Sequence, residues 1–148
     1  MRPCTFCEIV AGRAPASLVY RDDLVCAFLD IQPVNPGHLL VIPIEHASDL
    51  SELDPEVGAH LFRVGQLLVA ALRSSSLRCE GANLLLADGE AAGQEVFHVH
   101  LHVIPRYAAD GFGFRFAPGY SDRPTRDSLD RDAESIRAAL EDLGRASA

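Results

Sequence analysis

The hydrophobic and polar positions of this chain follow two periods, and the changes between them predict the order of its elements. Alternation and short apolar runs predict five β-strands, over 17–20, 24–29, 38–43, 82–86 and 98–104. Apolar residues at helical spacing predict a long helix over 54–74 and a last helix around 129–143, and a short helix is expected over 6–11.

Cap and turn residues place several of these boundaries. Asp54 is a helix cap followed by Pro55, which suits the first turn, so the long helix starts there. The segment 31–37 contains two prolines and a glycine, which predicts an ordered loop before His38. We expect Pro105 to end the last strand, because proline cannot donate to a sheet.

Three histidines occupy alternate positions of the last strand, at His98, His100 and His102. Because a strand turns alternate residues to one face, the imidazoles project together, and their face is either solvent-exposed or the floor of a cleft. Residues four apart on a strand are about 13 Å apart, so one metal ion is not expected to bind all three. A neutral imidazole is a good nucleophile for phosphorus when a hydrogen bond holds its Nδ1–H, and the central His100 fits that role best.

Length and charge narrow the classes of partner. The 148 residues suit one domain with a tail, and the formal net charge of −8 argues against a nucleic-acid polymer. All 13 basic residues are arginine, which excludes a P-loop or Schiff-base lysine and leaves a small nucleotide as a candidate ligand. The chain has no apolar run that suits a signal peptide or a membrane span, so we expect a cytoplasmic protein without membrane contact.

Cys4 and Cys7 form a Cys-x-x-Cys pair near the N-terminus. Such a pair either holds a metal ion or does redox work. Redox pairs of the thioredoxin kind follow a strand, whereas this pair precedes every predicted strand, so zinc is favoured. Two free thiols are the alternative, and Cys26 and Cys79 are interpreted as ordinary buried thiols.

The chain closely resembles the histidine-triad (HIT) family of nucleotide hydrolases and transferases. The family signature is His-φ-His-φ-His-φ-φ, where φ is apolar, and residues 98–104 match it. The resemblance runs from Cys4 to Arg106 and includes Pro-x-x-Pro-Gly-His ending at His38, Ile-Pro-x-x-His ending at His46, and Gly93-Gln94 before the triad.

This resemblance implies an α+β, HIT-like fold in which an antiparallel sheet of about five strands carries the long helix. It assigns residues 1–107 to the histidine-triad domain and leaves 108–148 as a C-terminal extension with one amphipathic helix. It also implies a homodimer that pairs through the long helix and the histidine strand.

The resemblance further implies roles for the site residues. In this family the central histidine, here His100, attacks the α-phosphate of a nucleotide and forms a nucleotidyl-histidine that water hydrolyses. His102 and His38 match positions that hydrogen-bond the phosphate and adjust the nucleophile, and Asp30 matches the residue that holds the ribose hydroxyls. The loop at Gly93-Gln94 is expected to bring backbone amides to the phosphate.

In family members with an N-terminal Cys-x-x-Cys pair, two histidines complete a tetrahedral structural zinc site. The matching residues here are His46 and His98, together with Cys4 and Cys7. Such a site ties the N-terminus to the catalytic strand and makes His98 structural.

Two positions depart from the family pattern. Ala87 stands where many members have an Asn or Gln that contacts phosphate, and Glu95 stands where many have Ser or Thr. We expect a nucleotide hydrolase that cleaves nucleoside 5′-phosphoramidates or dinucleoside polyphosphates at the α-phosphate and releases a nucleoside monophosphate, with AMP favoured. A nucleotidyltransferase or phosphorylase of the same family, and a slow-turnover nucleotide-binding regulatory protein, are the alternatives.

Overall fold

The computed structural model describes residues 4–146, so residues 1–3 of the predicted domain and 147–148 of the predicted extension lie outside the described residues. The chain divides into two compact units, 1–112 and 113–148, and each is described by itself. The second unit contains α3 (Arg126–Ala146). The first contains α1 (Thr5–Val10), β1 (Leu18–Arg21), β2 (Val25–Leu29), β3 (Leu39–Pro43), α2 (Pro55–Ser74), β4 (Gly81–Leu86), the 3₁₀ turn η1 (Glu90–Ala92) and β5 (Leu101–Arg106).

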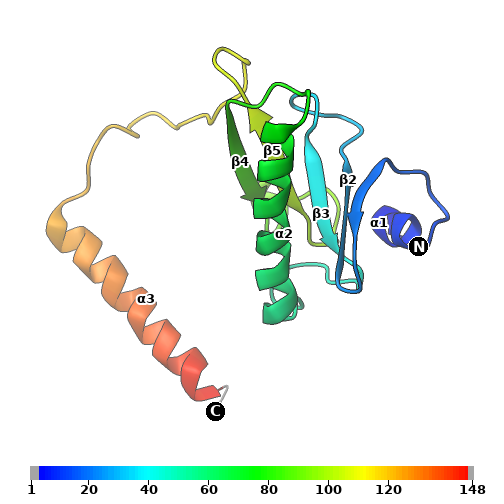
Figure 1. The fold of residues 1–148 in the computed structure, drawn as a ribbon. Coiled ribbons are helices and arrows are strands. Elements are labelled where there is room, and N and C mark those ends of the chain that lie inside the picture. Colours follow the sequence, from blue (N-terminus) through cyan, green and yellow to red (C-terminus); the bar gives the residue numbers. More distant parts are fainter. Residues whose placement is uncertain (1–3, 147–148) are drawn as a thin grey trace. The chain divides into compact units, whose positions relative to one another are not determined.

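The strands of the first unit form one antiparallel sheet in the order β1-β2-β3-β5-β4 (Figure 1). The predicted α+β fold is therefore confirmed, with five strands and the long helix α2 packed on them. β3 and β5 are neighbours although α2 and β4 separate them in the chain. Their register pairs Leu40 with His102, which brings the loop that ends at His38 beside the triad.

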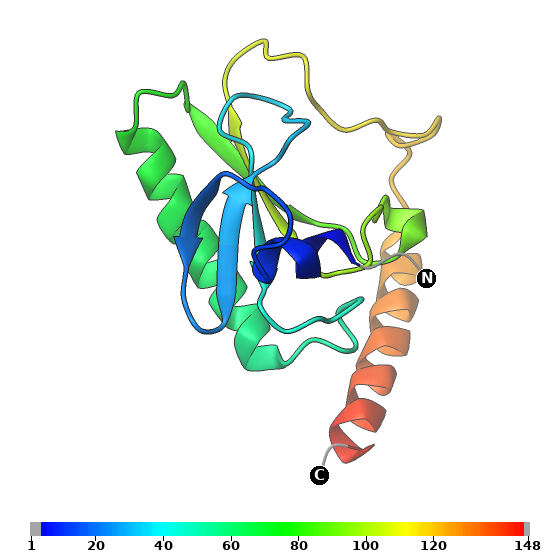
Figure 2. The same ribbon diagram turned by 90° about the vertical axis from the view of Figure 1, so that its right-hand side faces the viewer.

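The sheet separates two apolar layers. Val99, Leu101 and Val103 lie in the layer that α2 covers. Phe6 and Ile9 of α1 belong to the layer on the other face, and Figure 2 shows α1 and α2 on opposite sides of the sheet. His98 and His100 contact Phe6 of the α1 layer, and His102 contacts His100, as the alternation of the sequence predicts.

The structure corrects both ends of the predicted histidine strand. β5 begins at Leu101 rather than at His98, because the Val99 N–H donates to the carbonyl of Ala47 in the loop after β3. β5 also continues through Pro105 to Arg106, so the expectation that Pro105 ends the strand is wrong.

Pro105 is tolerated because its nitrogen faces away from β4. The Arg106 carbonyl accepts the Glu80 N–H on the β4 side, and successive strand residues direct their polar groups to opposite sides. The backbone nitrogen and carbonyl of Pro105 therefore point to the β3 side of the strand. β3 offers no partner at this level, because it begins at Leu39, which pairs with Val103. There the Asn35 side-chain amide donates to the Pro105 carbonyl at 2.9 Å, and no ladder hydrogen bond is lost.

α2 begins where the sequence predicts. The Asp54 carboxylate accepts the Glu56 N–H at 2.7 Å, which caps the helix. The buried face of α2 consists of Leu61, Val64, Gly65, Leu68 and Leu72. Gly65 allows a close approach to the sheet, because a Cβ at this position would lie 3.0 Å from Leu101 and 3.2 Å from Leu84.

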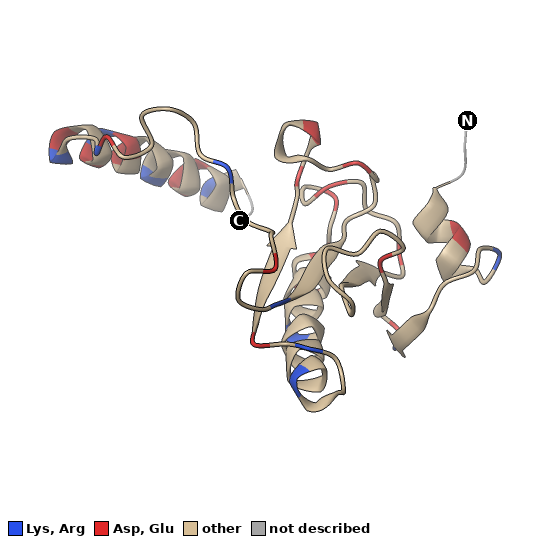
Figure 3. Cartoon of the chain, turned by 90° about the horizontal axis from the view of Figure 1, so that it is seen from above, with Lys and Arg blue, Asp and Glu red and all other residues tan. Residues whose placement is uncertain are grey.

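The second unit consists of an irregular segment and α3. Figure 3 shows both acidic and basic residues along α3, whereas its apolar residues Leu129, Ile136 and Leu140 are exposed. Within residues 4–146, none of the helices combines the length and the apolar character that crossing a bilayer requires.

Replacing Gly65 by leucine is expected to destabilise the protein. The new side chain would overlap Leu101 and Leu84. Because overpacking destabilises a core, the free energy of unfolding should fall by about 2 kcal/mol or more. Ala59→Leu places the same side chain at an exposed position of α2 and should change that energy by less than about 0.5 kcal/mol. Urea denaturation measures both, and equal effects would contradict the close approach at Gly65.

Candidate active site and metal centre

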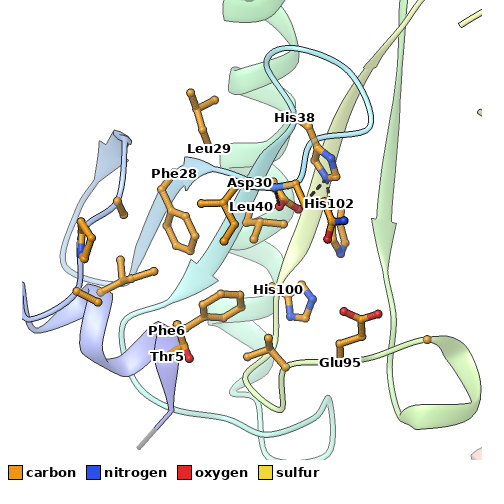
Figure 4. Close-up of a pocket in the computed structure, with 18 residues that line it drawn as sticks. Thr5, Phe6, Phe28, Leu29, Asp30, His38, Leu40, Glu95, His100 and His102 are labelled. Atoms are coloured by element: carbon orange, nitrogen blue, oxygen red, sulfur yellow. Dashed lines mark hydrogen bonds and ion pairs between the residues drawn. The ribbon is translucent and has the colours of Figure 1, made fainter.

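A cleft of about 620 Å³ opens on the α1 face of the sheet (Figure 4). Part of its lining is apolar, with Phe6, Phe28 and Leu40. The polar part of the lining includes Asp30, His38, Glu95, His100 and His102. An apolar wall beside a few convergent polar groups is typical of a small-molecule site.

A hydrogen bond fixes the tautomer of the buried His100 ring. Its Nδ1 lies 2.8 Å from the His98 carbonyl oxygen, which can only accept, so Nδ1 carries a proton and donates it. In the neutral ring the free lone pair is therefore on Nε2. His100 also lines the cleft.

A chain of hydrogen bonds fixes the protons of His38 and His102. The Val34 N–H donates to His38 Nδ1 at 3.1 Å, so His38 carries its proton on Nε2. His38 Nε2 then donates to His102 Nδ1 at 2.9 Å, which leaves the His102 proton on Nε2. His102 therefore keeps one N–H donor, and its ring lies 5.0 Å from that of His100 between centroids.

Burial keeps these two imidazoles uncharged. Burial, with a smaller effect of the His100 and His38 rings, lowers the pKa of His102 to about 4. Burial also lowers the pKa of His38, although the Asp30 carboxylate opposes this shift. Near neutral pH the hydrogen-bond chain therefore consists of neutral rings.

Asp30 follows β2 and lines the cleft. Its Oδ1 accepts the Gln32 N–H at 2.8 Å, which fixes the turn, and its Oδ2 lies 3.6 Å from His38 Nε2. The side chain is partly exposed, so Oδ2 retains the capacity to accept a hydrogen bond from a ligand hydroxyl.

The loop at Gly93-Gln94 differs from the expectation that its amides meet a phosphate. The Gly93 N–H donates to the Glu90 carbonyl, and the Gln94 N–H donates to the Gly89 carbonyl, so both amides are already used within the loop. The buried Gln94 side chain donates to the Ser48 carbonyl and accepts from the Gly89 N–H. Gly93 lines the cleft, whereas Gln94 supports the loop from behind.

The four predicted metal ligands meet at the other end of the triad. The ligand atoms of Cys4, Cys7, His46 and His98 all lie within 4.8 Å of one another. His98 Nδ1 is 3.5 Å from Cys4 Sγ and 3.6 Å from Cys7 Sγ. It is also 3.2 Å from His46 Nδ1. Tetrahedral zinc at ordinary bond lengths separates its ligand atoms by about 3.4–3.8 Å, so this arrangement fits the ion.

The protonation of these histidines also fits a metal. His98 Nε2 donates to the Pro43 carbonyl at 2.9 Å, so the lone pair of the neutral ring is on Nδ1, which faces the thiols. His46 Nε2 lies 3.3 Å from Ser48 Oγ, a suitable acceptor for its proton. Burial lowers the pKa of His98, which favours the neutral ring that a metal binds. Two lone pairs that face one another beside two sulfur atoms are the donor set of structural zinc.

Sequence reasoning missed the network that supports the loop before His38. Arg106 makes a bidentate ion pair with Asp110 at 2.6 and 2.8 Å, and Asn35 donates to the same carboxylate at 2.8 Å. The Arg106 donors hold the pKa of Asp110 well below its usual range. No local pattern joins Asn35 to this ion pair, because Asn35 is distant in the sequence from Arg106 and Asp110.

Comparisons with known proteins agree with this geometry. The sequence profile of the HIT domain matches residues 11–109. An uncharacterized HIT-like protein of Borreliella burgdorferi is 47% identical over 116 residues, covering 78% of this chain and 84% of that protein.

Solved structures share the fold over nearly the whole chain. A zinc-bound histidine triad family protein from Mycobacterium smegmatis is 43% identical with a TM-score of 0.72, covering 97% of this chain and 96% of that chain. A histidine triad nucleotide-binding protein from Candida albicans is 28% identical with a TM-score of 0.83, covering 95% and 99%. The matched profile includes both the loop before His38 and the complete triad. The chain therefore belongs to the HIT domain family.

Proposed function

We propose that the protein hydrolyses a nucleotide at its α-phosphate through a covalent intermediate on His100. The hydrogen bond from His100 Nδ1 to the His98 carbonyl carries this proposal, because it places the lone pair of the neutral ring on Nε2 in a residue that lines a cleft of ligand size. Family membership and the nucleotide-binding relative from C. albicans support a nucleotide as the ligand. The substrates are nucleoside 5′-phosphoramidates or dinucleoside polyphosphates, and the product is a nucleoside monophosphate, with AMP favoured.

The reaction takes place in two displacements. First, His100 Nε2 bonds to phosphorus while the bond from phosphorus to the leaving group breaks. The electron pair of that bond leaves with the departing group, and a departing amine takes up one proton from solvent. Water then attacks phosphorus, the bond to His100 breaks, and one proton returns to solvent. The His98 carbonyl keeps its hydrogen bond to Nδ1–H throughout and stabilises the positive charge that the ring gains.

The other cleft residues bind and orient the nucleotide. Neutral His102 donates its Nε2–H to a phosphate oxygen, and His38 keeps it in the tautomer that can do so. Asp30 Oδ2 accepts from a ribose hydroxyl, while Phe6 and Phe28 supply an apolar wall for the base.

His100→Ala is expected to lower kcat/KM by about 10³-fold or more, because the variant lacks the nucleophile. AMP release from an adenosine 5′-phosphoramidate and from diadenosine tetraphosphate, measured by chromatography, tests this. His60→Ala is the matched control, since His60 binds Asp22 at 2.6 Å and does not line the cleft. Unchanged turnover by His100→Ala would contradict the proposal.

Two other outcomes of this assay favour the alternatives. Nucleotide release that requires phosphate instead of water would indicate a phosphorylase or transferase. Tight nucleotide binding without turnover, equal in the wild type and in His100→Ala, would indicate a binding protein.

We further propose that Cys4, Cys7, His46 and His98 hold a structural zinc ion. The geometry of the four ligand atoms and the zinc-bound relative from M. smegmatis support this. When bound, zinc would supply a cross-link, because its four ligands come from the start of α1, the loop after β3 and the segment that leads into β5. Cys4 and Cys7 flank Phe6, whose ring meets that of His100 at 5.3 Å between centroids, so the cross-link would fix one wall of the cleft.

Metal analysis of the purified protein should find about one zinc ion per chain, and Cys4→Ser should remove it. We expect this variant to lose about 5 °C or more in Tm, because the cross-link is lost. Cys79→Ser is the control, since Cys79 lies outside the cluster and should leave the zinc content unchanged. A wild-type protein purified without chelators that contains no zinc would refute the site.

We also propose a homodimer, the assembly that the family resemblance implies through the long helix and the histidine strand. Because β5 has β3 and β4 on its two sides, we assign the sheet part of this interface to the β4 edge, beside α2. β4 is an edge strand, and Phe62 and Val69 of α2 line a shallow apolar hollow with Leu84 of β4. Phe62 remains 59% exposed, although its apolar surface would be more stable when covered.

Phe62→Glu should convert this dimer to a monomer, because it places a charge in an apolar interface. Light scattering after size-exclusion chromatography gives the mass. Leu18→Glu is the control at the opposite edge of the sheet, on β1, and should leave a dimer. A monomeric wild type, or a dimer that survives Phe62→Glu, would contradict this interface.

A further inference from the structure

The cleft contains an unpaired negative charge beside the nucleophile. Among the residues that line it, the formally charged ones are Asp30 and Glu95, and both are acidic. No arginine lines it, the chain has no lysine, and burial keeps His38 and His102 neutral. A cleft whose lining holds two carboxylates and neither arginine nor lysine does not favour ligands with several negative charges.

The two carboxylates differ in their surroundings. Asp30 accepts the Gln32 N–H and lies near His38, so local groups partly satisfy it. Within the described residues, Glu95 has no hydrogen-bond or ion-pair partner, and its side chain is exposed in the cleft. Its charge is therefore available to interact with a ligand.

The backbone next to Glu95 is held in place, because the residue before it is fixed. The buried Gln94 side chain bonds to Ser48 and Gly89 and holds the loop in place. Figure 4 shows the Glu95 carboxylate projecting into the cleft on one side of His100, while Phe6 and Phe28 lie on the other side. A nucleotide whose base packs against the aromatic rings would direct its leaving group toward Glu95.

We propose that Glu95 selects leaving groups that carry a positive charge and disfavours those that carry a negative charge. This inference rests on the proposed hydrolysis and narrows its substrate class to phosphoramidates of amines with a second, cationic group. A polyphosphate leaving group would place several negative charges beside a carboxylate. The reaction itself is unchanged: the P–N bond breaks, its electron pair leaves with the amine, and the amine takes up a proton from solvent.

Three adenosine 5′-phosphoramidates that differ in the charge of the leaving amine test this proposal. They are made from 1,3-diaminopropane, butylamine and β-alanine, whose free ends are cationic, neutral and anionic. The wild type should have kcat/KM in that order, with about tenfold between the cationic and the anionic substrate. Glu95→Gln should bring this ratio close to one, and 0.5 M NaCl should reduce it in the wild type.

Glu90→Gln is the matched control. Glu90 lies in the same loop and is exposed, but it does not line the cleft, so its loss should leave the ratio unchanged. A ratio that is the same in the wild type and in Glu95→Gln, or one that Glu90→Gln lowers equally, would overturn the proposal.

Failure of the proposed hydrolysis is a distinct result. In that case none of the three compounds is cleaved by the wild type. Their dissociation constants, measured by calorimetry with the wild type and Glu95→Gln, then give the same comparison. The wild type should bind the cationic compound most tightly, and Glu95→Gln should remove that preference. Equal binding of all three compounds by the wild type would refute the role of Glu95.

Discussion

Two backbone carbonyls fix the protons of neighbouring histidines in opposite ways, and both sites depend on this difference. The Pro43 carbonyl accepts from His98 Nε2, whereas the His98 carbonyl accepts from His100 Nδ1. His98 therefore offers Nδ1 to the cysteine–histidine cluster, and His100 offers Nε2 to the cleft. Both rings are imidazoles of one short segment. Their hydrogen bonds therefore determine which ring suits a metal ion and which ring suits attack on phosphorus.

The short helix α1 links these two sites. The Phe6 ring meets His98 at 5.9 Å and His100 at 5.3 Å between centroids, while Cys4 and Cys7 lie on either side of Phe6 in the chain. A helix of six residues has little stability of its own. The apolar layer holds α1 against the sheet, and a bound metal ion would add a second attachment.

Local patterns predicted much of this arrangement, and the errors have tertiary causes. Alternation placed Val99 and Leu101 in one layer and the histidines in the other, and Asp54 marked the start of α2. Pro105 was wrongly expected to end β5, because its effect depends on which side of the strand lacks a partner. Gln94 was expected to present its amide to a ligand, but its N–H is used within the loop.

Covalent catalysis by His100 is tested most directly by the mass of the protein quenched during turnover of an adenosine 5′-phosphoramidate. Alkaline quenching preserves a phosphorus–nitrogen bond to histidine. We expect a fraction of the wild-type protein to gain one adenylyl group, and fragmentation to place that group on His100 within residues 98–104. A single turnover that releases AMP without any adduct, or an adduct on another residue, would contradict this mechanism.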